Sequence, residues 1–278
     1  MKKIQMMLFS LLIAGFCGNS FAAKTDTLAT YSNAMQKTIP AIVVTPDNYN
    51  PDKKYPVVYL LHGYSGNYTG WMNINGDYIR KTSDDENVII VSPDGGYSSW
   101  YYDVPGDKDC QYETYIASEL IRWIDRHYST IQSPKGRGIT GLSMGGHGAL
   151  FLSFRHPDVF GVAGSMSGGV DIRPFPLNWD MAKRLGSYAE HPENWEKNTV
   201  INLTYLLAPN TLKIIIDCGT EDFFYTVNQN LHQKLLENNI PHDFISRPGK
   251  HDSAYWSNAI KYQLLFMVEN FKQFQINQ

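Results

Sequence analysis

The chain has 278 residues, of which 43% are hydrophobic, 13% aromatic and 18% charged, a composition that supports a large buried core and excludes an intrinsically disordered chain. Its formal net charge of -3 leaves no basic surplus for neutralising phosphates, so we expect no nucleic-acid partner. Three cysteines without a C-x-x-C pair disfavour a disulfide scaffold, a zinc ribbon and an iron–sulfur cluster.

The amino-terminal segment has the pattern of a secretory signal. Two lysines precede an apolar run over residues 6–16, and small residues at 20–23 offer a cleavage site. A membrane anchor needs about 20 apolar residues, more than this run supplies. Lipid attachment at Cys17 is an alternative, although the preceding residue is larger than such signals favour. We expect residues 1–22 to be removed, leaving one domain over 23–278 that is secreted or periplasmic, without a stable membrane span.

Strands and helices alternate along this domain. Segments 27–31 and 41–44 are expected to be antiparallel edge strands. Short β-branched runs, typical of strands buried on both faces of a parallel sheet, lie at 57–61, 88–91 and 212–217. Further strands are expected at 138–140, 160–166 and 242–247. Apolar residues at helical spacing follow at 112–127, 149–152, 224–238 and 255–274. This order predicts a three-layer α/β domain with a mostly parallel central sheet and helices on both faces.

Residues 171–209 break the alternation. Several prolines and two tryptophans, Trp179 and Trp195, stand there among polar residues without a strand-like run. We interpret the segment as a small cap insertion with short helices over the carboxyl ends of the strands, where specificity is usually built. A surface excursion without a ligand role is the alternative.

The strongest chemical signal is the run Gly-Leu-Ser-Met-Gly-Gly at residues 141–146. It follows a predicted strand and precedes a predicted helix, which is the setting of a nucleophile elbow. The sharp turn exposes the serine hydroxyl, and the glycines two residues away on each side let strand and helix approach closely. Ser143 then lies at the amino end of a helix, where the dipole favours an oxyanion. We predict that Ser143 is a nucleophile.

A serine nucleophile needs a base and a carboxylate that orients the base. Asp222 follows the predicted strand 212–217, and His251 follows the predicted strand 242–247. Together with Ser143 they give the chain order serine, aspartate, histidine that α/β-hydrolases have. Asp217 and Glu221 are competing carboxylates, but Asp217 ends a strand and is expected to be structural.

A tetrahedral intermediate also needs two hydrogen-bond donors for its oxyanion. The elbow supplies one, the backbone N–H of Met144. The second is expected from the His-Gly-Tyr-Ser-Gly run at 62–66, in which the backbone N–H of Tyr64 is the candidate. We assign His62 to hydrogen bonding within this loop. An ordinary glycine turn is the alternative.

Five motifs together resemble the esterase D family of α/β-hydrolases. They are Leu-Leu-His-Gly at 60–63, Pro-Asp-Gly-Gly at 93–96, the elbow at 141–146, Asp-Cys-Gly-Thr-Glu-Asp at 217–222 and Gly-Lys-His-Asp at 249–252. They occur in family order over nearly the whole domain. This family includes S-formylglutathione hydrolases, feruloyl and tributyrin esterases and mycolyltransferases. The resemblance implies an α/β-hydrolase fold and carboxylic-ester hydrolysis by the residues identified above, and we expect no metal or organic cofactor.

The substrate is less clearly indicated. Trp100, Phe223, Trp179 and Trp256 are candidates for an aromatic acyl pocket, whereas Trp71 is expected to pack in the core. We interpret the protein as a secreted serine esterase that removes feruloyl, acetyl or other short acyl groups from carbohydrate or small esters. An acyltransferase with the same triad and an inactive carbohydrate-binding scaffold are the alternatives. Two cysteines of the mature chain, Cys110 and Cys218, either pair or remain buried thiols.

Overall fold

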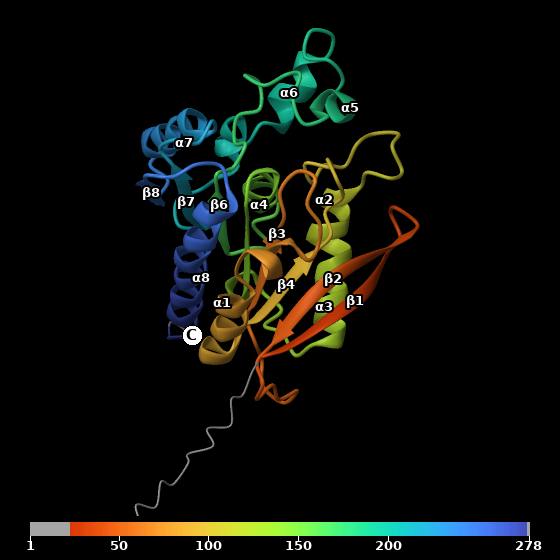
Figure 1. Cartoon of the computed structure of the whole chain (residues 1–278), viewed down its shortest axis with the longest axis vertical. Helices are drawn as coiled ribbons and strands as arrows, with labels where there is room; N and C mark the ends of the chain where they lie inside the picture. The colour runs from red at the N-terminus through yellow and green to blue at the C-terminus, as the bar shows by residue number, and fades with distance from the viewer. Residues whose placement is uncertain (1–22, 277–278) are drawn as a thin grey trace, which may run out of the picture.

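The structure is a computed structural model that describes residues 23–276 (Figure 1). The predicted signal segment 1–22, with Cys17, lies outside the described residues. Within the described range, no helix combines the length and the apolar character that crossing a bilayer requires. Cys110 and Cys218 are both buried free thiols.

One mixed sheet forms the centre of the molecule, with strand order β1-β2-β4-β3-β5-β6-β7-β8. From β4 to β8 every neighbouring pair is parallel, while β1 pairs antiparallel with β2 and β2 with β4. The predicted parallel sheet with two antiparallel edge strands is confirmed. The strands are β1 (Lys24–Ser32), β2 (Lys37–Thr45), β3 (Val57–Leu61), β4 (Ile89–Pro93), β5 (Arg137–Gly141), β6 (Val162–Met166), β7 (Lys213–Gly219) and β8 (Asp243–Arg247).

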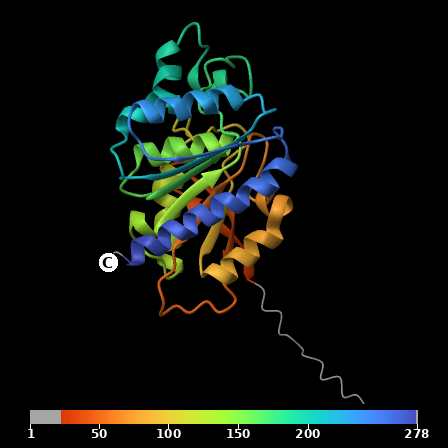
Figure 2. The ribbon, with the colours of Figure 1, turned by 90° about the vertical axis from the view of Figure 1, so that its left-hand side faces the viewer.

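Helices cover both faces of the sheet. They are α1 (Gly70–Glu86), α2 (Tyr112–Thr114), the π-helical segment η1 (Tyr115–Leu120), α3 (Ile121–His127), the short 3-10 turn η2 (Pro134–Gly136), α4 (Met144–Arg155), α7 (Tyr225–Glu237) and α8 (Ser253–Ile276). Alternate side chains of β3 enter two separate cores. Tyr59 joins the core under α3, α4 and α7, whereas Leu60 joins the core under α1 and α8, which lie side by side in Figure 2. The three-layer arrangement is therefore confirmed.

Helix α1 is not predicted by the sequence pattern. Its buried large apolar side chains are few, with Trp71 and Ile79 alone fully buried. The backbone also leaves helical geometry at Asn75, where φ is −157° and ψ is 53°. A kinked helix with a thin apolar stripe gives little periodicity, which explains why the pattern fails here.

Residues 171–209, here called the insert, connect β6 to β7. They hold three short helices, α5 (Met181–Leu185), α6 (Pro192–Asn198) and the 3-10 turn η3 (Val200–Leu206). Figure 1 shows α5 and α6 beyond the carboxyl ends of the strands. Trp195 is fully buried and its Nε1–H donates to the carbonyl of Gly186 at 3.0 Å. Trp195 also belongs to the same buried cluster as Tyr59 of β3 and Phe151 of α4, so the insert shares the core of the main body.

Helix α4 carries a buried histidine directly behind the predicted elbow. His147 is fully buried, its Nδ1 donates to the carbonyl of Gly169 at 3.0 Å, and its ring stacks on Phe151. Burial lowers the pKa of His147 from 6.5 to about 4, because the interior disfavours the charged ring. The histidine is thus held neutral in the folded protein.

This buried histidine predicts an acid-sensitive fold. Since the unfolded chain takes up the proton near pH 6.5 and the folded chain only near pH 4, the free energy of unfolding should fall as pH drops through that window. At pH 4.5 the protonation of His147 in the unfolded chain should lower the free energy of unfolding by about 2 to 3 kcal/mol relative to pH 7. Urea unfolding at pH 7 and pH 4.5 measures it, with His147→Asn as the comparison. An equal pH-dependent loss in both proteins would contradict the prediction.

Candidate active site

Ser143 lies on the turn between β5 and α4. Its φ of 55° and ψ of −117° are values that non-glycine residues rarely adopt, at a cost of about 1 to 3 kcal/mol. The turn is held from both sides. The N–H of Ser143 donates to the carbonyl of Met166 at 2.9 Å, and its carbonyl accepts the N–H of His147 at 3.0 Å. The strained turn keeps the hydroxyl at the edge of the sheet.

Glycines allow the strand and the helix to meet at this turn. A Cβ on Gly141 would lie 2.5 Å from the carbonyl carbon of Gly145, and a Cβ on Gly145 would lie 2.3 Å from the carbonyl oxygen of Leu61. Real side chains do not reach such distances without displacing backbone. The two glycines therefore have a steric role, as the elbow motif predicts.

The structure brings Ser143, His251 and Asp222 together in one chain of hydrogen bonds. His251 Nε2 is 2.9 Å from Ser143 Oγ, and His251 Nδ1 is 2.8 Å from Asp222 Oδ2. The side chain of Asp222 is fully buried, and its Oδ1 accepts the N–H of Phe224 at 2.8 Å. Because an ionised carboxylate only accepts, Nδ1 carries the proton and Nε2 faces the serine hydroxyl as an acceptor.

The two competing carboxylates have other partners. Asp217 is fully buried and accepts hydrogen bonds from Arg247 and Tyr255. Burial raises the pKa of Asp217, while both partners oppose the shift. The side chain of Glu221 is 55% exposed, with Lys250 3.8 Å away. The geometry favours Asp222 over both.

The loop after β3 lies directly against the elbow. A Cβ on Gly63 would lie 3.3 Å from Ser143 Cβ. The side chain of His62 fixes this loop, because its Nδ1 donates to the carbonyl of Gly63 at 2.8 Å and its Nε2 accepts the N–H of Gly95 at 2.7 Å. Burial lowers the pKa of His62, consistent with a neutral ring.

The two predicted oxyanion donors are both free. Across residues 23–276, the backbone N–H groups of Tyr64 and Met144 donate to no protein acceptor. They belong to the loop after β3 and to the first residue of α4, on the two segments that meet at Ser143. Two unpaired N–H groups beside a nucleophile are what an oxyanion requires.

A cavity of about 430 Å³ opens beside Ser143 and His251. Three of the four predicted pocket residues, Trp179, Phe223 and Trp256, line it. Trp71 is fully buried in the core under α1 and α8, as predicted, and also borders the cavity. The rest of the lining is His62, Gly63, Tyr64, Ser65, Gly66, Gly70, Ile74 and Leu142. The cavity is therefore largely aromatic and apolar, as ligand sites commonly are.

Trp100, the fourth predicted pocket residue, is not among the residues that line this cavity. It is only 1% exposed and its ring packs against His147. Its Nε1–H donates to the carbonyl of Trp179 at 3.2 Å. Trp100 thus supports Trp179 from behind, because the loop that carries it turns its ring into the core.

Aromatic rings surround the imidazole of His251. The ring centroid of Phe223 is 4.2 Å away with an interplanar angle of 36°, and Trp256 stands edge-on at 4.9 Å. Phe223 stacks in turn on Trp179, at 5.6 Å and 21°. The imidazole therefore has one face covered by a stack that reaches into the insert.

We expect Phe223→Ala to lower kcat/KM for ester hydrolysis about tenfold. The variant removes the ring that covers His251 and that would stabilise its protonated form by a cation–π contact worth about 1 to 2 kcal/mol. Phe223→Tyr keeps the ring and should stay within about threefold of wild type. Steady-state kinetics with 4-nitrophenyl acetate tests both. A wild-type kcat/KM in Phe223→Ala would show that the ring of Phe223 packs against His251 without affecting the reaction.

Comparisons with known proteins point to an esterase family. Residues 32–267 match the family described as "Putative esterase". The MPT51 antigen of Mycobacterium leprae is 32% identical over 163 residues, 58% of this chain and 50% of that protein, so the chain spans about half the length of this relative. The diacylglycerol acyltransferase/mycolyltransferase Ag85B of Mycobacterium leprae is 30% identical over 224 residues, 74% of this chain and 67% of that protein.

Among solved structures, a ferulic acid esterase superposes with a TM-score of 0.77 at 27% identity, covering 90% of this chain and 99% of that one. The predicted α/β-hydrolase fold and the resemblance to the esterase D family are thereby confirmed. The chain therefore belongs to this esterase family of α/β-hydrolases.

Proposed function

We propose that the protein is a serine carboxylic-ester hydrolase in which Ser143, His251 and Asp222 form the catalytic triad. The observation that carries the proposal is the continuous hydrogen-bond chain, 2.9 Å from serine to histidine and 2.8 Å from histidine to aspartate. His251 takes the hydroxyl proton as Ser143 Oγ attacks the ester carbonyl. The N–H groups of Tyr64 and Met144 stabilise the oxyanion.

The same histidine then completes the reaction. His251 passes its proton to the leaving alcohol, and an acyl-enzyme remains on Ser143. Water enters, loses a proton to His251 and attacks the acyl carbon. The bond from the acyl carbon to Ser143 Oγ then breaks as His251 returns the proton to Oγ, which releases the acid and restores the hydroxyl. Asp222 holds the imidazole in the required tautomer throughout. No metal or organic cofactor takes part in these steps.

For the acyl group we propose a flat aromatic acid of the feruloyl type, carried on carbohydrate or a small alcohol, ahead of acetyl and short aliphatic groups. Trp71, Trp179, Phe223 and Trp256 line the cavity beside Ser143, and flat rings pack well between such side chains. The similarity to a ferulic acid esterase at 27% identity supports the same choice.

A panel of esters tests the activity and the acyl preference together. We expect the highest kcat/KM with methyl ferulate, lower values with 4-nitrophenyl butyrate and acetate and with acetylated xylan, and little activity on a formyl thioester. Trp179→Ala should reduce kcat/KM for methyl ferulate more than for 4-nitrophenyl acetate. Absence of hydrolysis across the panel overturns the proposed activity, and a preference for acetylated xylan overturns the proposed acyl group.

Acyl transfer is the second candidate, favoured by the likeness to Ag85B, whose name describes an acyltransferase. Both reactions share the acyl-enzyme and differ in whether water or an acceptor alcohol attacks it. Product analysis with methyl ferulate and excess free sugar separates them. We expect ferulic acid as the main product, while a ferulated sugar in excess would establish transfer.

The remaining alternative, an inactive scaffold, would leave Ser143 unlabelled by a fluorophosphonate.

We further propose that the enzyme acts outside the cytoplasm, after removal of residues 1–22. The support is the sequence pattern of that segment, two lysines followed by an apolar run and small residues. Mass spectrometry of the protein from the periplasm or medium should find a chain that begins at Ala23.

A further inference from the structure

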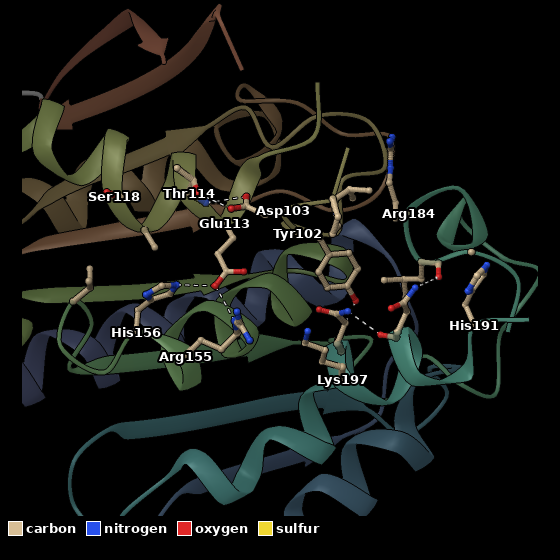
Figure 3. Close-up of a pocket in the computed structure, with 18 of the residues that line it drawn as sticks. Tyr102, Asp103, Glu113, Thr114, Ser118, Arg155, His156, Arg184, His191 and Lys197 are labelled. Atoms are coloured by element: carbon tan, nitrogen blue, oxygen red, sulfur yellow. Dashed lines mark hydrogen bonds and ion pairs between the residues drawn. The ribbon is translucent and has the colours of Figure 1, made fainter. Parts of the chain in front are cut away.

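A second and larger cavity, of about 730 Å³, lies between the insert and the main body (Figure 3). It shares no lining residue with the cavity at Ser143. Its walls come from the loop after β4, from α2 and η1, from the carboxyl end of α4 and from α5 and α6. The lining residues include Tyr102, Asp103, Glu113, Ser118, Arg155, Asp158, Arg184, Leu185 and Lys197.

The charges that line this cavity cancel. With His156 and His191 counted as neutral, its lining holds three carboxylates and three basic side chains: Asp103, Glu113, Asp158, Arg155, Arg184 and Lys197. A balanced lining offers no net attraction to an anion or a cation. It does offer hydrogen-bond donors and acceptors close together. Hydroxyl groups, which both donate and accept, match such a surface best.

Part of the lining is held in place by internal bonds. Glu113 accepts hydrogen bonds from Arg155 Nε at 2.7 Å and from His156 Nε2 at 2.8 Å. Arg184 Nε donates to the carbonyl of Ser98 at 3.0 Å. Figure 3 shows these side chains around the cavity. The walls are thus organised before any ligand binds, which reduces the entropy lost on binding.

Other groups of the lining keep unused hydrogen-bonding capacity. In the part of the chain that the structure describes, Lys197 Nζ, Ser118 Oγ and the two terminal amino groups of Arg155 make no hydrogen bond to protein. Tyr102 and Leu185 line the wall but are almost fully buried, so the accessible apolar surface comes from Pro105 and Val159, which also line the cavity. Free polar groups next to small apolar patches suit the hydroxyl edges and C–H faces of a sugar.

We propose that this second cavity binds a neutral oligosaccharide segment of the carbohydrate that carries the ester. The inference rests on the proposed function. The insert connects the two cavities, because Trp179 lines the catalytic cavity and Arg184, on the following helix α5, lines the second. A sugar chain in the second cavity therefore contacts the same segment that contributes to the acyl pocket.

Isothermal titration with xylotetraose tests the proposal, with tetragalacturonate as the anionic comparison. We expect wild type to bind xylotetraose with a Kd of about 1 mM, equivalent to about 4 kcal/mol. Lys197→Met, which removes a free donor, and Ser118→Phe, which fills the cavity, should each raise the Kd at least about fivefold. Lys261→Met, an exposed lysine on α8, is the matched control and should bind as wild type.

Hydrolysis of 4-nitrophenyl acetate should be unchanged in all three variants, since none of these side chains lines the cavity at Ser143. Three results would overturn the proposal: no binding of xylotetraose, tighter binding of tetragalacturonate, or binding of xylotetraose that survives both Lys197→Met and Ser118→Phe. Failure of wild type to cleave any ester would refute the proposed function separately, because sugar binding is measured without an ester.

Discussion

Ser143→Ala is expected to lower kcat for ester hydrolysis by about 10⁴- to 10⁶-fold, to the residual rate that the oxyanion donors and binding alone supply. The variant removes Ser143 Oγ, which lies 2.9 Å from His251 Nε2. Labelling by a fluorophosphonate should disappear, while the circular dichroism spectrum should remain that of wild type.

Ser165 provides the matched control for this substitution. It lies on β6, is fully buried, and its hydroxyl has no hydrogen-bond partner within residues 23–276. Ser165→Ala should therefore keep kcat within about threefold of wild type. Wild-type turnover in Ser143→Ala, or a large loss of turnover in Ser165→Ala alone, would show that the nucleophile is misassigned.

Asp222→Asn is expected to lower kcat by about 10⁴-fold with little change in KM. An amide at this position presents an N–H₂ group to His251 Nδ1, so the imidazole proton moves to Nε2. That nitrogen can then no longer accept the serine proton. Rates measured between pH 6 and pH 9 should stay low throughout.

Asp217→Asn tests which of the two buried carboxylates, Asp217 or Asp222, acts on His251. Asp217 accepts hydrogen bonds from Arg247 and Tyr255 rather than from the imidazole. Its loss leaves the partly buried Arg247 side chain without its buried carboxylate partner, which should lower the free energy of unfolding by about 3 kcal/mol. The kcat of the folded fraction should stay within about tenfold of wild type. A larger loss of kcat in Asp217→Asn than in Asp222→Asn would show that Asp217, and not Asp222, orients His251.

Much of this architecture could be predicted from local sequence. The β-branched runs mark β3, β4 and β7, which are buried strands, so the centre of the sheet follows from local sequence, whereas β8 at the edge is partly exposed. The elbow is equally local, because its glycines and Ser143 act within five residues. The order of serine, aspartate and histidine then indicates which strand ends have to meet.

The residues that line the cavity at Ser143 could not be predicted in the same way. Trp71 and Trp100 are both large, aromatic and almost fully buried, yet one lines the cavity at Ser143 and the other lies behind Trp179. Which ring faces a cavity depends on how α1 and the loop after β4 pack, and neither leaves a periodic signal. The second cavity was missed for a related reason, since its charged residues come from five separate segments.

The attachment of the insert has a consequence for how such enzymes diversify. β6 and β7 are neighbouring parallel strands, so the connection that holds the insert leaves β6 at its carboxyl end, Met166, and enters β7 at the opposite edge of the sheet, at Lys213; the sheet fixes both points. Lengthening a connection between fixed ends costs only about 0.6 kcal/mol per doubling of its length. Ser143, Asp222 and His251 all lie outside the insert, so changes within this segment can alter the cavity wall at Trp179 while those three residues keep their places.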